Sequence, residues 1–414
     1  MKRNAGPGHR KNAPNWYLVV GLGIATRAVT VAYMYPPCSR GWGGEMPAVA
    51  ESIDRGDGFA SPYLIATGPT ALVPPVYPYL LSVIFRLFGP HTVVSGVVAL
   101  GLNVMLSALV AIPLYFLTAK LCSVKTAIVV SWVWAVLPIA GYTDALFVWN
   151  TSLYTLTLTT LLAAIVAAPK DHSRRWWACC GALTGFLIVL EPISLTVVGV
   201  AFLWLVYRRV PLKTLLTACA AAALLPACWT ARNIREFHQP VFLRSGFGLE
   251  LSSGVRSFEL AGDLPTSLPN RNPVELEKYR SMGELDYFRS RQASALEWIR
   301  QHPRQYAIRV IKRGVGFWTG HNVSRPYLYP NRFASVERAL FVIPAIGAFV
   351  GVLFVEPTKR TLVLGILILY PIAFYFTHVE LRQRFPIDPL LLALTIYGAE
   401  MIWKRFSLLQ SISD

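Results

Sequence analysis

The chain has 414 residues, of which 54% are hydrophobic and only 15% are charged. This composition excludes an ordinary soluble globular protein and predicts a membrane protein that crosses the bilayer several times. The net charge of +17 does not indicate nucleic acid binding, because the Lys and Arg residues cluster beside apolar runs, as topology signals and lipid headgroup contacts do.

Apolar runs near the roughly 17 to 25 residues needed to cross a bilayer recur along the chain. About ten can be placed, at residues 16–36, 93–118, 124–140, 146–168, 176–190, 193–207, 212–230, 337–355, 361–377 and 388–403. If successive runs cross the membrane in alternating directions, the short segments rich in Lys and Arg all fall on one side of it, from Lys2 and Arg3 to Lys404 and Arg405. By the positive-inside rule, both termini are predicted to be cytoplasmic.

This topology divides the chain into three regions. Residues 1–230 form an N-terminal transmembrane module with a first outer loop at 37–92, residues 231–336 form an outer-face helical region, and residues 337–414 form the C-terminal transmembrane helices. Both long outer segments are expected to contain short amphipathic helices. Because no sizeable domain is left in the cytoplasm, we expect the protein to act at the outer face.

The first outer loop holds four carboxylates, namely Glu45, Glu51, Asp54 and Asp57. Glu45 comes after a Gly-rich turn and before AVAESI, which can start a short helix. A carboxylate held near an acceptor hydroxyl can act as a general base, and Glu45 is the candidate, although most loop carboxylates are merely solvated. Further on, the aromatic segment that begins at Pro74-Pro75 predicts a helix lying along the membrane.

The late outer segment carries helix signals. Asn272, Pro273 and Glu275 form an N-terminal capping pattern, and the helical period then continues through GELDYFRSRQASALEWIRQH until Pro303. A second helix is predicted over PRQYAIRVIKRGVGFW. Its mixture of basic and apolar residues suits either a helix at the headgroup level or a soluble helix with a solvated basic face.

Several charged residues near the membrane are functional candidates. Arg27 lies within the first span, where it could serve function, reach the interface or pair with a loop carboxylate. Glu191 is interpreted as a turn residue. Arg232, Arg235 and Arg244 follow the seventh span, and Arg382 and Arg384 precede the last one. At these places the arginines could bind phosphate or anchor the chain to lipid headgroups. The nearby His378, Glu380 and Asp388 match no metal-site spacing, so no metal site is predicted.

The chain resembles membrane glycosyltransferases of the glycosyltransferase-C (GT-C) fold, in the bacterial branch related to glycosyltransferase family 39. That branch is similar to protein O-mannosyltransferases and to the enzymes that add aminoarabinose to lipid A. The resemblance covers most of the chain. It depends on Glu45 with the helix and Gly56-Asp57-Gly58-Phe59 after it, on TGPTALVPPVYPYLL, on WTARN and on RQRFPIDP.

The resemblance implies an inverting transfer of a sugar from a polyprenyl-phosphate carrier to an acceptor at the outer face, with Glu45 as base. Arg384 and Pro386 match the family's Arg-x-Pro element, for which a role in binding the carrier phosphate is implied. Family members often show an Asp-Glu pair where this chain has Gly44-Glu45. Asn150 occupies a position where related sequences can carry an acid. This difference counts against a metal-dependent version of the mechanism.

The leading hypothesis is therefore a polyprenyl-phosphate-sugar-dependent hexosyl- or pentosyltransferase of a bacterial inner membrane, with its active site facing the periplasm. Arg384 binds the carrier phosphate with Arg382 or Arg232, and Arg27, Glu51 and His378 are candidates for support. The acceptor is a lipid, a glycan or a protein, and membrane lipids surround the chain. No cofactor is assigned, and a divalent metal ion is left open. The alternatives are a transporter or flippase for a lipid-linked or small anionic substrate and an inactive relative that binds carrier lipid.

Overall fold

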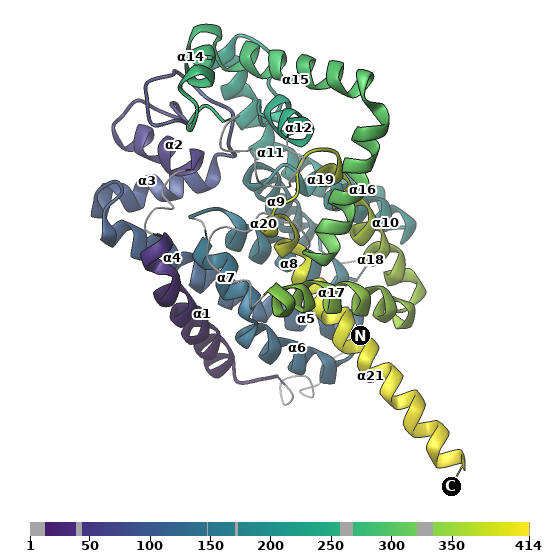
Figure 1. Ribbon diagram of the computed structural model, residues 1–414. Helices are drawn as coiled ribbons and strands as arrows, with labels where there is room; N and C mark the ends of the chain where they lie inside the picture. Colours follow the sequence, from purple (N-terminus) through teal and green to yellow (C-terminus); the bar gives the residue numbers. More distant parts are fainter. Residues whose placement is uncertain are drawn as a thin grey trace.

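The computed structural model describes residues 13–38, 44–146, 148–169, 173–256, 268–320 and 334–413. Within these ranges the regular structure is helical, with one isolated antiparallel bridge between Ala60 and Pro69. The predicted all-α fold class is therefore confirmed. A helical bundle lies beneath a layer of further helices, which is at the top of Figure 1.

The bundle contains the helices of the predicted transmembrane regions. In chain order they are α1 (Trp16–Cys38), α4 (Val93–Leu109), α5 (Ala111–Leu121), α6 (Val124–Val136), α7 (Pro138–Leu146), α8 (Thr151–Ala167), α9 (Arg174–Leu190), α10 (Ser194–Tyr207), α11 (Leu212–Phe237), α17 (Ala334–Gly351), η3 (Val352–Phe354), α18 (Pro357–Leu369), α19 (Ile372–Phe376), α20 (Leu381–Arg384), η4 (Phe385–Ile387) and α21 (Asp388–Ser413). The two long loops supply α2 (Glu45–Asp54), α3 (Val76–Phe88), α12 (Phe247–Arg256), α14 (Pro273–Met282), α15 (Glu284–Gln301) and α16 (Pro303–Thr319). We call α2, α3, α12, α14 and α15 the outer layer.

Five helical stretches of the described chain are long and apolar enough to cross a membrane: Trp16–Met34, Val93–Leu121, Leu212–Phe237, Pro357–Phe376 and Arg382–Gln410. Helices α6 and α7 add a sixth if their 45° bend is a break within one span. Each predicted apolar run contains a helix, so the chain is a multi-pass membrane protein. The number of ten spans stays a prediction.

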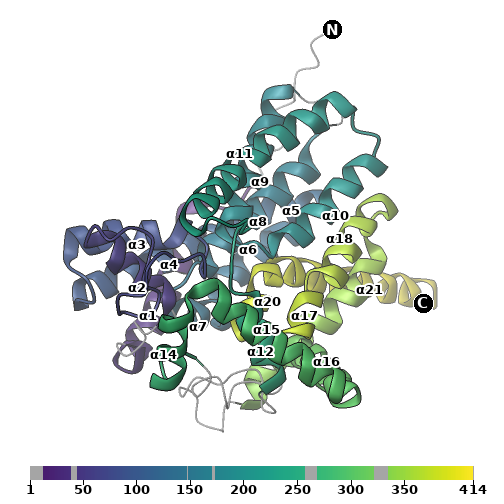
Figure 2. The ribbon, with the colours of Figure 1, turned by 90° about the horizontal axis from the view of Figure 1, so that it is seen from above.

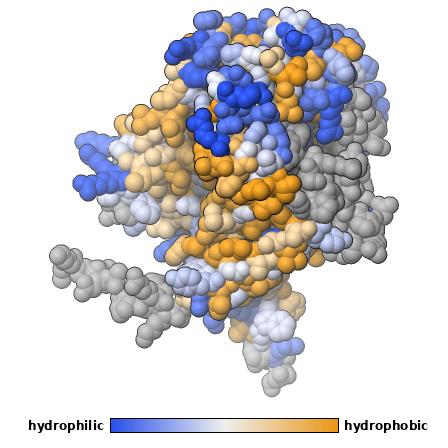
Figure 3. All heavy atoms as spheres, turned by 90° about the vertical axis from the view of Figure 1, so that its left-hand side faces the viewer, coloured by the Kyte–Doolittle hydropathy of each residue, from blue (hydrophilic) through white to orange (hydrophobic). Residues whose placement is uncertain are grey.

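The surface matches this arrangement. Figure 3 shows apolar side chains gathered over the bundle, whereas hydrophilic side chains dominate the outer layer at the top. Large exposed apolar side chains lie on α1 and α4, among them Tyr17, Val29, Tyr33, Val93 and Val97. An apolar surface this extensive is expected to face lipid rather than water.

Two glycines let α9 and α11 approach closely. A Cβ atom on Gly181 would stand 2.2 Å from the backbone oxygen of Ala218, and one on Gly185 would stand 2.5 Å from that of Ala222. Small residues four apart on one face commonly bring membrane helices into contact. Because the contacts advance in the same direction along both helices, α9 and α11 run parallel and end on the same side.

The late outer helices begin where the sequence predicts. Asn272 Oδ1 accepts hydrogen bonds from the backbone N–H groups of Val274 (3.0 Å) and Glu275 (3.3 Å), which caps α14. Helix α16 exposes the apolar side chains of Ile308, Ile311 and Val315 along one face. This exposed stripe favours the headgroup-level alternative over a fully solvated helix.

Glu284 joins the two outer loops. Its buried carboxylate accepts hydrogen bonds from Thr70 Oγ1 (2.5 Å), the Ala71 backbone N–H (2.7 Å), Ser245 Oγ (2.6 Å) and the Tyr279 hydroxyl (2.7 Å). These donors offset the free-energy cost of removing the carboxylate from water. The first loop and the late segment are therefore built into one layer.

The start of α1 and the end of α21 lie on the side of the bundle opposite the outer layer (Figure 1). This arrangement agrees with a topology that puts both ends of the chain on one side of a membrane. The cytoplasmic assignment of that side, and the division of the chain at residues 230 and 336, stay predictions.

Candidate active site

Seven ionisable side chains from four separate segments interact where the outer layer meets the bundle. We name them the outer charge cluster: Glu45, Glu191, Arg244, Glu250, His378, Glu380 and Arg382. Glu45 is the first residue of α2, Glu191 follows α9, and residues 378–382 lead from α19 into α20. Seen from above, α20 lies near the middle of the molecule (Figure 2).

His378 lies between two carboxylates. Its Nδ1 is 2.9 Å from Glu250 Oε2, and its Nε2 is 3.7 Å from Glu380 Oε1. The other oxygen of Glu380 is 2.5 Å from Arg382 Nε. A continuous row of ionisable side chains thus connects α12 to α20.

Arg244 extends this row to α9. Its guanidinium lies 3.5 Å from Glu250 Oε1 and 3.7 Å from Glu191 Oε1, and its Nε donates to the backbone oxygen of Leu72 at 2.8 Å. Asn150 Nδ2 donates to Glu191 Oε2 at 3.2 Å. The first loop, the late segment and the ends of two bundle helices are all joined to the cluster.

Trp149 supports Arg382. The Arg382 guanidinium carbon lies 4.3 Å from the centre of the Trp149 ring, a cation–π distance. A Cβ atom on Gly44 would come within 3.1 Å of the same ring. The indole therefore fills the space beside Gly44, where the resemblance implies the first acid of an Asp-Glu pair.

Glu45 is half-buried, and within the described part of the chain its carboxylate makes no ion pair or hydrogen bond with another side chain. Burial raises the pKa of Glu45. Its own backbone N–H and the charge of Arg382 oppose this increase, and the nearby Glu250 and Glu380 add to it. A carboxylate with a raised pKa is a stronger proton acceptor than an ordinary glutamate.

The neighbouring acids differ from Glu45. Burial works against the charge on Glu250, but His378, Arg244 and Arg382 outweigh it and hold the Glu250 pKa at about 2. The pKa of Glu380 is also lowered, because Arg382 and His378 outweigh its burial. Burial lowers the pKa of His378 less than Glu250 and Glu380 raise it, so the net shift is upward. Glu250 and Glu380 thus favour their charged forms, and Glu45 is the better base.

Arg384 is engaged elsewhere. It is 1% exposed, its Nε lies 2.8 Å from Asp388 Oδ1, and its Nη1 donates to the backbone oxygens of Phe341 (2.9 Å) and Trp318 (3.2 Å). These contacts join α16, α17 and α21. In this structure the Arg384 donors face protein groups.

Arg232 holds the first loop against α11. Its guanidinium donates to the backbone oxygens of Thr70 (2.7 Å) and Phe59 (2.8 Å) and lies over the rings of Phe59 and Trp229. Its contacts, like those of Arg384, are structural.

The other supporting candidates also lie outside the cluster. Arg27 pairs with Asp144 of α7 at 3.5 Å rather than with a carboxylate of the first loop. Glu51 contacts His91 Nε2 and Arg55 Nη1, each at 2.8 Å, farther along α2. Of the three supporting candidates, His378 alone belongs to the outer charge cluster.

Two members of this site were missed in the sequence, and one was interpreted as structural. Glu250 and Trp149 carry no motif; the only signal for Glu250 is an acid within the mostly apolar GFGLELSSG. Glu191 does end α9, as a turn residue would, but its carboxylate also contacts Arg244. Residues brought together from segments this distant cannot be found by spacing.

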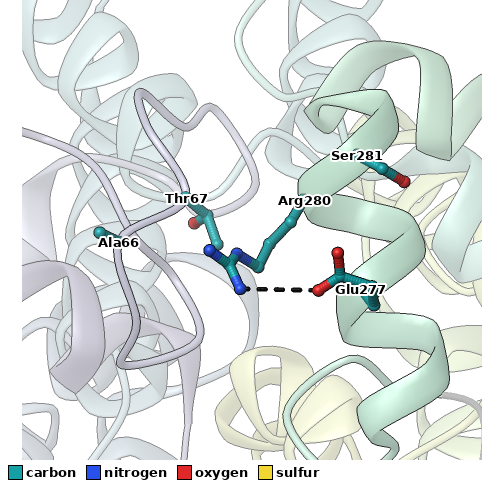
Figure 4. A pocket seen from close by; sticks show the side chains of 5 residues that line it. All are labelled: Ala66, Thr67, Glu277, Arg280 and Ser281. Atoms are coloured by element: carbon teal, nitrogen blue, oxygen red, sulfur yellow. Dashed lines mark ion pairs between the residues drawn. The ribbon is translucent and has the colours of Figure 1, made fainter.

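The described residues contain no group of three His, Cys, Asp or Glu side chains able to hold a metal ion. A surface hollow lies elsewhere, between the first loop and α14, and no cluster residue lines it. Figure 4 shows its lining: Ala66, Thr67, Glu277, Arg280 and Ser281. Arg280 extends toward Thr67 and pairs with Glu277 at 3.5 Å.

No protein-family model and no curated protein matches the sequence. Solved structures do match. The oligosaccharyltransferase of Archaeoglobus fulgidus, tethered to an acceptor peptide, aligns with 96% of this chain and 51% of its own length, with a TM-score of 0.53 and 12% identity. The oligosaccharyltransferase AglB of the same archaeon, in complex with an inhibitory peptide and a dolichol-phosphate, aligns over the same shares with a TM-score of 0.51 and 12% identity. The chain has a GT-C-like fold.

ArnT from Cupriavidus metallidurans, bound to undecaprenyl phosphate, aligns with 93% of this chain and 77% of its own, with a TM-score of 0.37 and 14% identity. The chain spans about half the length of the oligosaccharyltransferase it matches. At this identity the likeness concerns the fold, and membership of the bacterial family-39 branch stays a prediction.

Proposed function

We propose that this protein transfers a sugar from a polyprenyl-phosphate carrier to an acceptor hydroxyl at the outer face of a membrane. The observation that carries the proposal is Glu45, a half-buried carboxylate with a raised pKa, beside the cations of the outer charge cluster. The fold adds support, because one structure of the matching oligosaccharyltransferase contains a dolichol-phosphate and a peptide. The outer layer would then face the periplasm of a bacterial inner membrane.

In the proposed reaction, the acceptor oxygen attacks the sugar carbon that is bonded to the carrier phosphate. Glu45 takes the proton of the acceptor hydroxyl as the new carbon–oxygen bond forms. The old carbon–oxygen bond breaks, and its electron pair leaves with the carrier phosphate. Attack from the opposite side inverts the configuration at the sugar carbon.

Negative charge develops on the carrier phosphate, and Arg382 is the cation we assign to it. Arg382 is held by Glu380 and Trp149 next to Glu45, whereas Arg384 and Arg232 already donate to backbone oxygens. A positioned guanidinium can stabilise such a leaving group through charge-assisted hydrogen bonds. Arg384 and Arg232 would then shape the site without contacting phosphate.

The test is sugar transfer by the purified protein in lipid, with a panel of radiolabelled undecaprenyl-phosphate-linked hexoses and pentoses, and octyl glucoside and water as acceptors. We expect labelled product and released undecaprenyl phosphate from at least one donor. Release from no donor would contradict the proposal and favour the transporter alternative.

Arg382→Ala is expected to slow transfer about 100-fold or more, because loss of one positioned donor to a developing anion typically has an effect of that size. Arg280→Ala is the matched control, since Arg280 lies on the outer layer away from the cluster and is 54% exposed at its side chain. Equal rates for Arg382→Ala and the wild type would remove Arg382 from the mechanism.

A further inference from the structure

Tyr63 is a buried tyrosine with an unused hydroxyl. It is 5% exposed, and its hydroxyl oxygen has no hydrogen-bond partner among the residues that the structure describes. A buried polar group without a partner is unfavourable and rare in native structures, so it requires an explanation.

Two other buried tyrosines of the outer layer differ from Tyr63 in this respect. The ring of Tyr279 packs edge-on against that of Tyr63, with centroids 5.0 Å apart, and its hydroxyl donates to Glu284 at 2.7 Å. The hydroxyl of Tyr287 donates to Glu275 at 2.8 Å. The layer therefore provides carboxylate acceptors for both neighbours, but Tyr63 has none.

The backbone around Tyr63 is held in an unusual conformation. Ser61 and Leu64, on either side of it, have φ angles of +56° and +64°, which residues other than glycine rarely adopt. The loop is fixed by the Ser61 N–H bond to the Gly68 oxygen (3.0 Å) and by the Thr67 N–H bond to Ser61 Oγ (3.3 Å). Strain of this kind is retained where surrounding contacts enforce it and often marks functional sites.

Tyr63 shares one hydrophobic cluster with the neighbours of Glu45 and Trp149 in the sequence. It belongs to the same hydrophobic cluster as Met46, which follows Glu45, and Val148, which precedes Trp149. Burial raises the pKa of Tyr63 well above its ordinary value, and the nearby charges of Glu45 and Glu284 raise it further. Tyr63 therefore keeps its proton and is a hydrogen-bond donor close to the proposed base.

We propose that the Tyr63 hydroxyl binds a substrate hydroxyl beside Glu45, which makes Tyr63 a substrate-positioning residue. This inference rests on the proposed function. The tyrosine O–H would donate to the substrate oxygen, and Glu45 would accept the hydrogen of that same hydroxyl. A hydroxyl can satisfy both groups at once, because it has one donor and two acceptor positions.

Two sources can supply this hydroxyl, namely the acceptor and the sugar of the lipid-linked donor. The experiment separates them through Tyr63→Phe, which keeps the ring packing against Tyr279 and removes only the hydroxyl. KM and kcat are measured for the panel donor that the wild type uses fastest, first with the donor varied and then with octyl glucoside varied. Tyr287→Phe is the matched control, because its hydroxyl is paired within the protein.

We expect Tyr63→Phe to raise KM for one of the two substrates about tenfold, the effect of one lost hydrogen bond, with an unchanged Tm. Tyr287→Phe should lower Tm and leave both KM values unchanged. The substrate whose KM rises is the source of the bound hydroxyl.

Unchanged KM and kcat for Tyr63→Phe in an active wild-type background would overturn the inference and leave the proposed function intact. A lower Tm with unchanged KM would also overturn it, since the hydroxyl would then act in folding. A wild type that consumes no donor would overturn the proposed function and the inference together.

Discussion

Replacing Glu45 with glutamine is expected to abolish sugar transfer while leaving the protein folded and membrane-inserted. Glutamine keeps the size of the side chain but cannot take a proton from the acceptor hydroxyl. General-base catalysis typically accounts for about 10²- to 10⁴-fold in rate, so a loss within or above that range is expected. The measurement is the initial rate of labelled product formation by purified protein in lipid.

Glu51→Gln is the control for this change. Glu51 lies on the same helix as Glu45, but its carboxylate contacts His91 and Arg55 at the surface of the outer layer. We expect Glu51→Gln to retain transfer. A Glu45→Gln variant as active as the wild type would exclude Glu45 as the base, and inactivity of both variants would indicate a general effect on α2.

The rate should also depend on pH through Glu45. The base acts in its charged form, and burial raises its pKa, so transfer is lost as the pH falls through that raised value. The acidic limb of the profile should therefore lie at higher pH than for an ordinary glutamate. The pKa values of Glu250 and Glu380 are shifted in the opposite direction, so these acids should stay charged throughout this limb.

Local signals predicted the helices well. The capping pattern at Asn272 gave the start of α14, and the apolar runs contain the bundle helices, because both depend on residues close in sequence. Breaks within apolar runs were harder to predict. The run at 124–140 is split at Leu137, whose extended backbone separates α6 from α7.

The candidate site was only partly accessible from the sequence. Glu45 was named from its place after the first span and Arg382 from its place before the last one, but the same segment also contains Arg384, whose donors face Asp388 and backbone oxygens. Two arginines two residues apart in one helical turn point in different directions, and only tertiary packing decides which one reaches the cluster. Glu250 is brought into the site by the fold of the late segment, and no local sequence pattern predicts that fold.

Arg27 is the second position where a large effect is expected. This arginine and its partner Asp144 are each 1% exposed, and their closest charged atoms are 3.5 Å apart. Arg27 also donates to the backbone oxygens of Trp134 (2.9 Å) and Ala135 (2.9 Å). Both oxygens lie in the last turn of α6, which ends at Val136, so their regular helical partners are missing. The Leu137 N–H donates to the Trp134 oxygen at 3.4 Å and Thr26 Oγ1 to the Ala135 oxygen at 2.7 Å, and Arg27 completes this capping of the broken span.

Arg27→Met should therefore destabilise the protein by about 3–5 kcal/mol, the usual cost of leaving one member of a buried ion pair without its partner. The measurement is the unfolding midpoint in detergent. Arg86→Met, at an arginine whose side chain is 77% exposed, should leave the midpoint unchanged.

The double variant Arg27→Met, Asp144→Leu separates the two contributions of Arg27. It removes the unpaired charge but still lacks the Arg27 hydrogen bonds to the oxygens of Trp134 and Ala135, so it should recover part of the lost stability. Full recovery would mean that the capping contributes nothing. If Arg27→Met lost transfer with an unchanged midpoint, the structural role would be wrong, and Arg27 would act in the reaction instead.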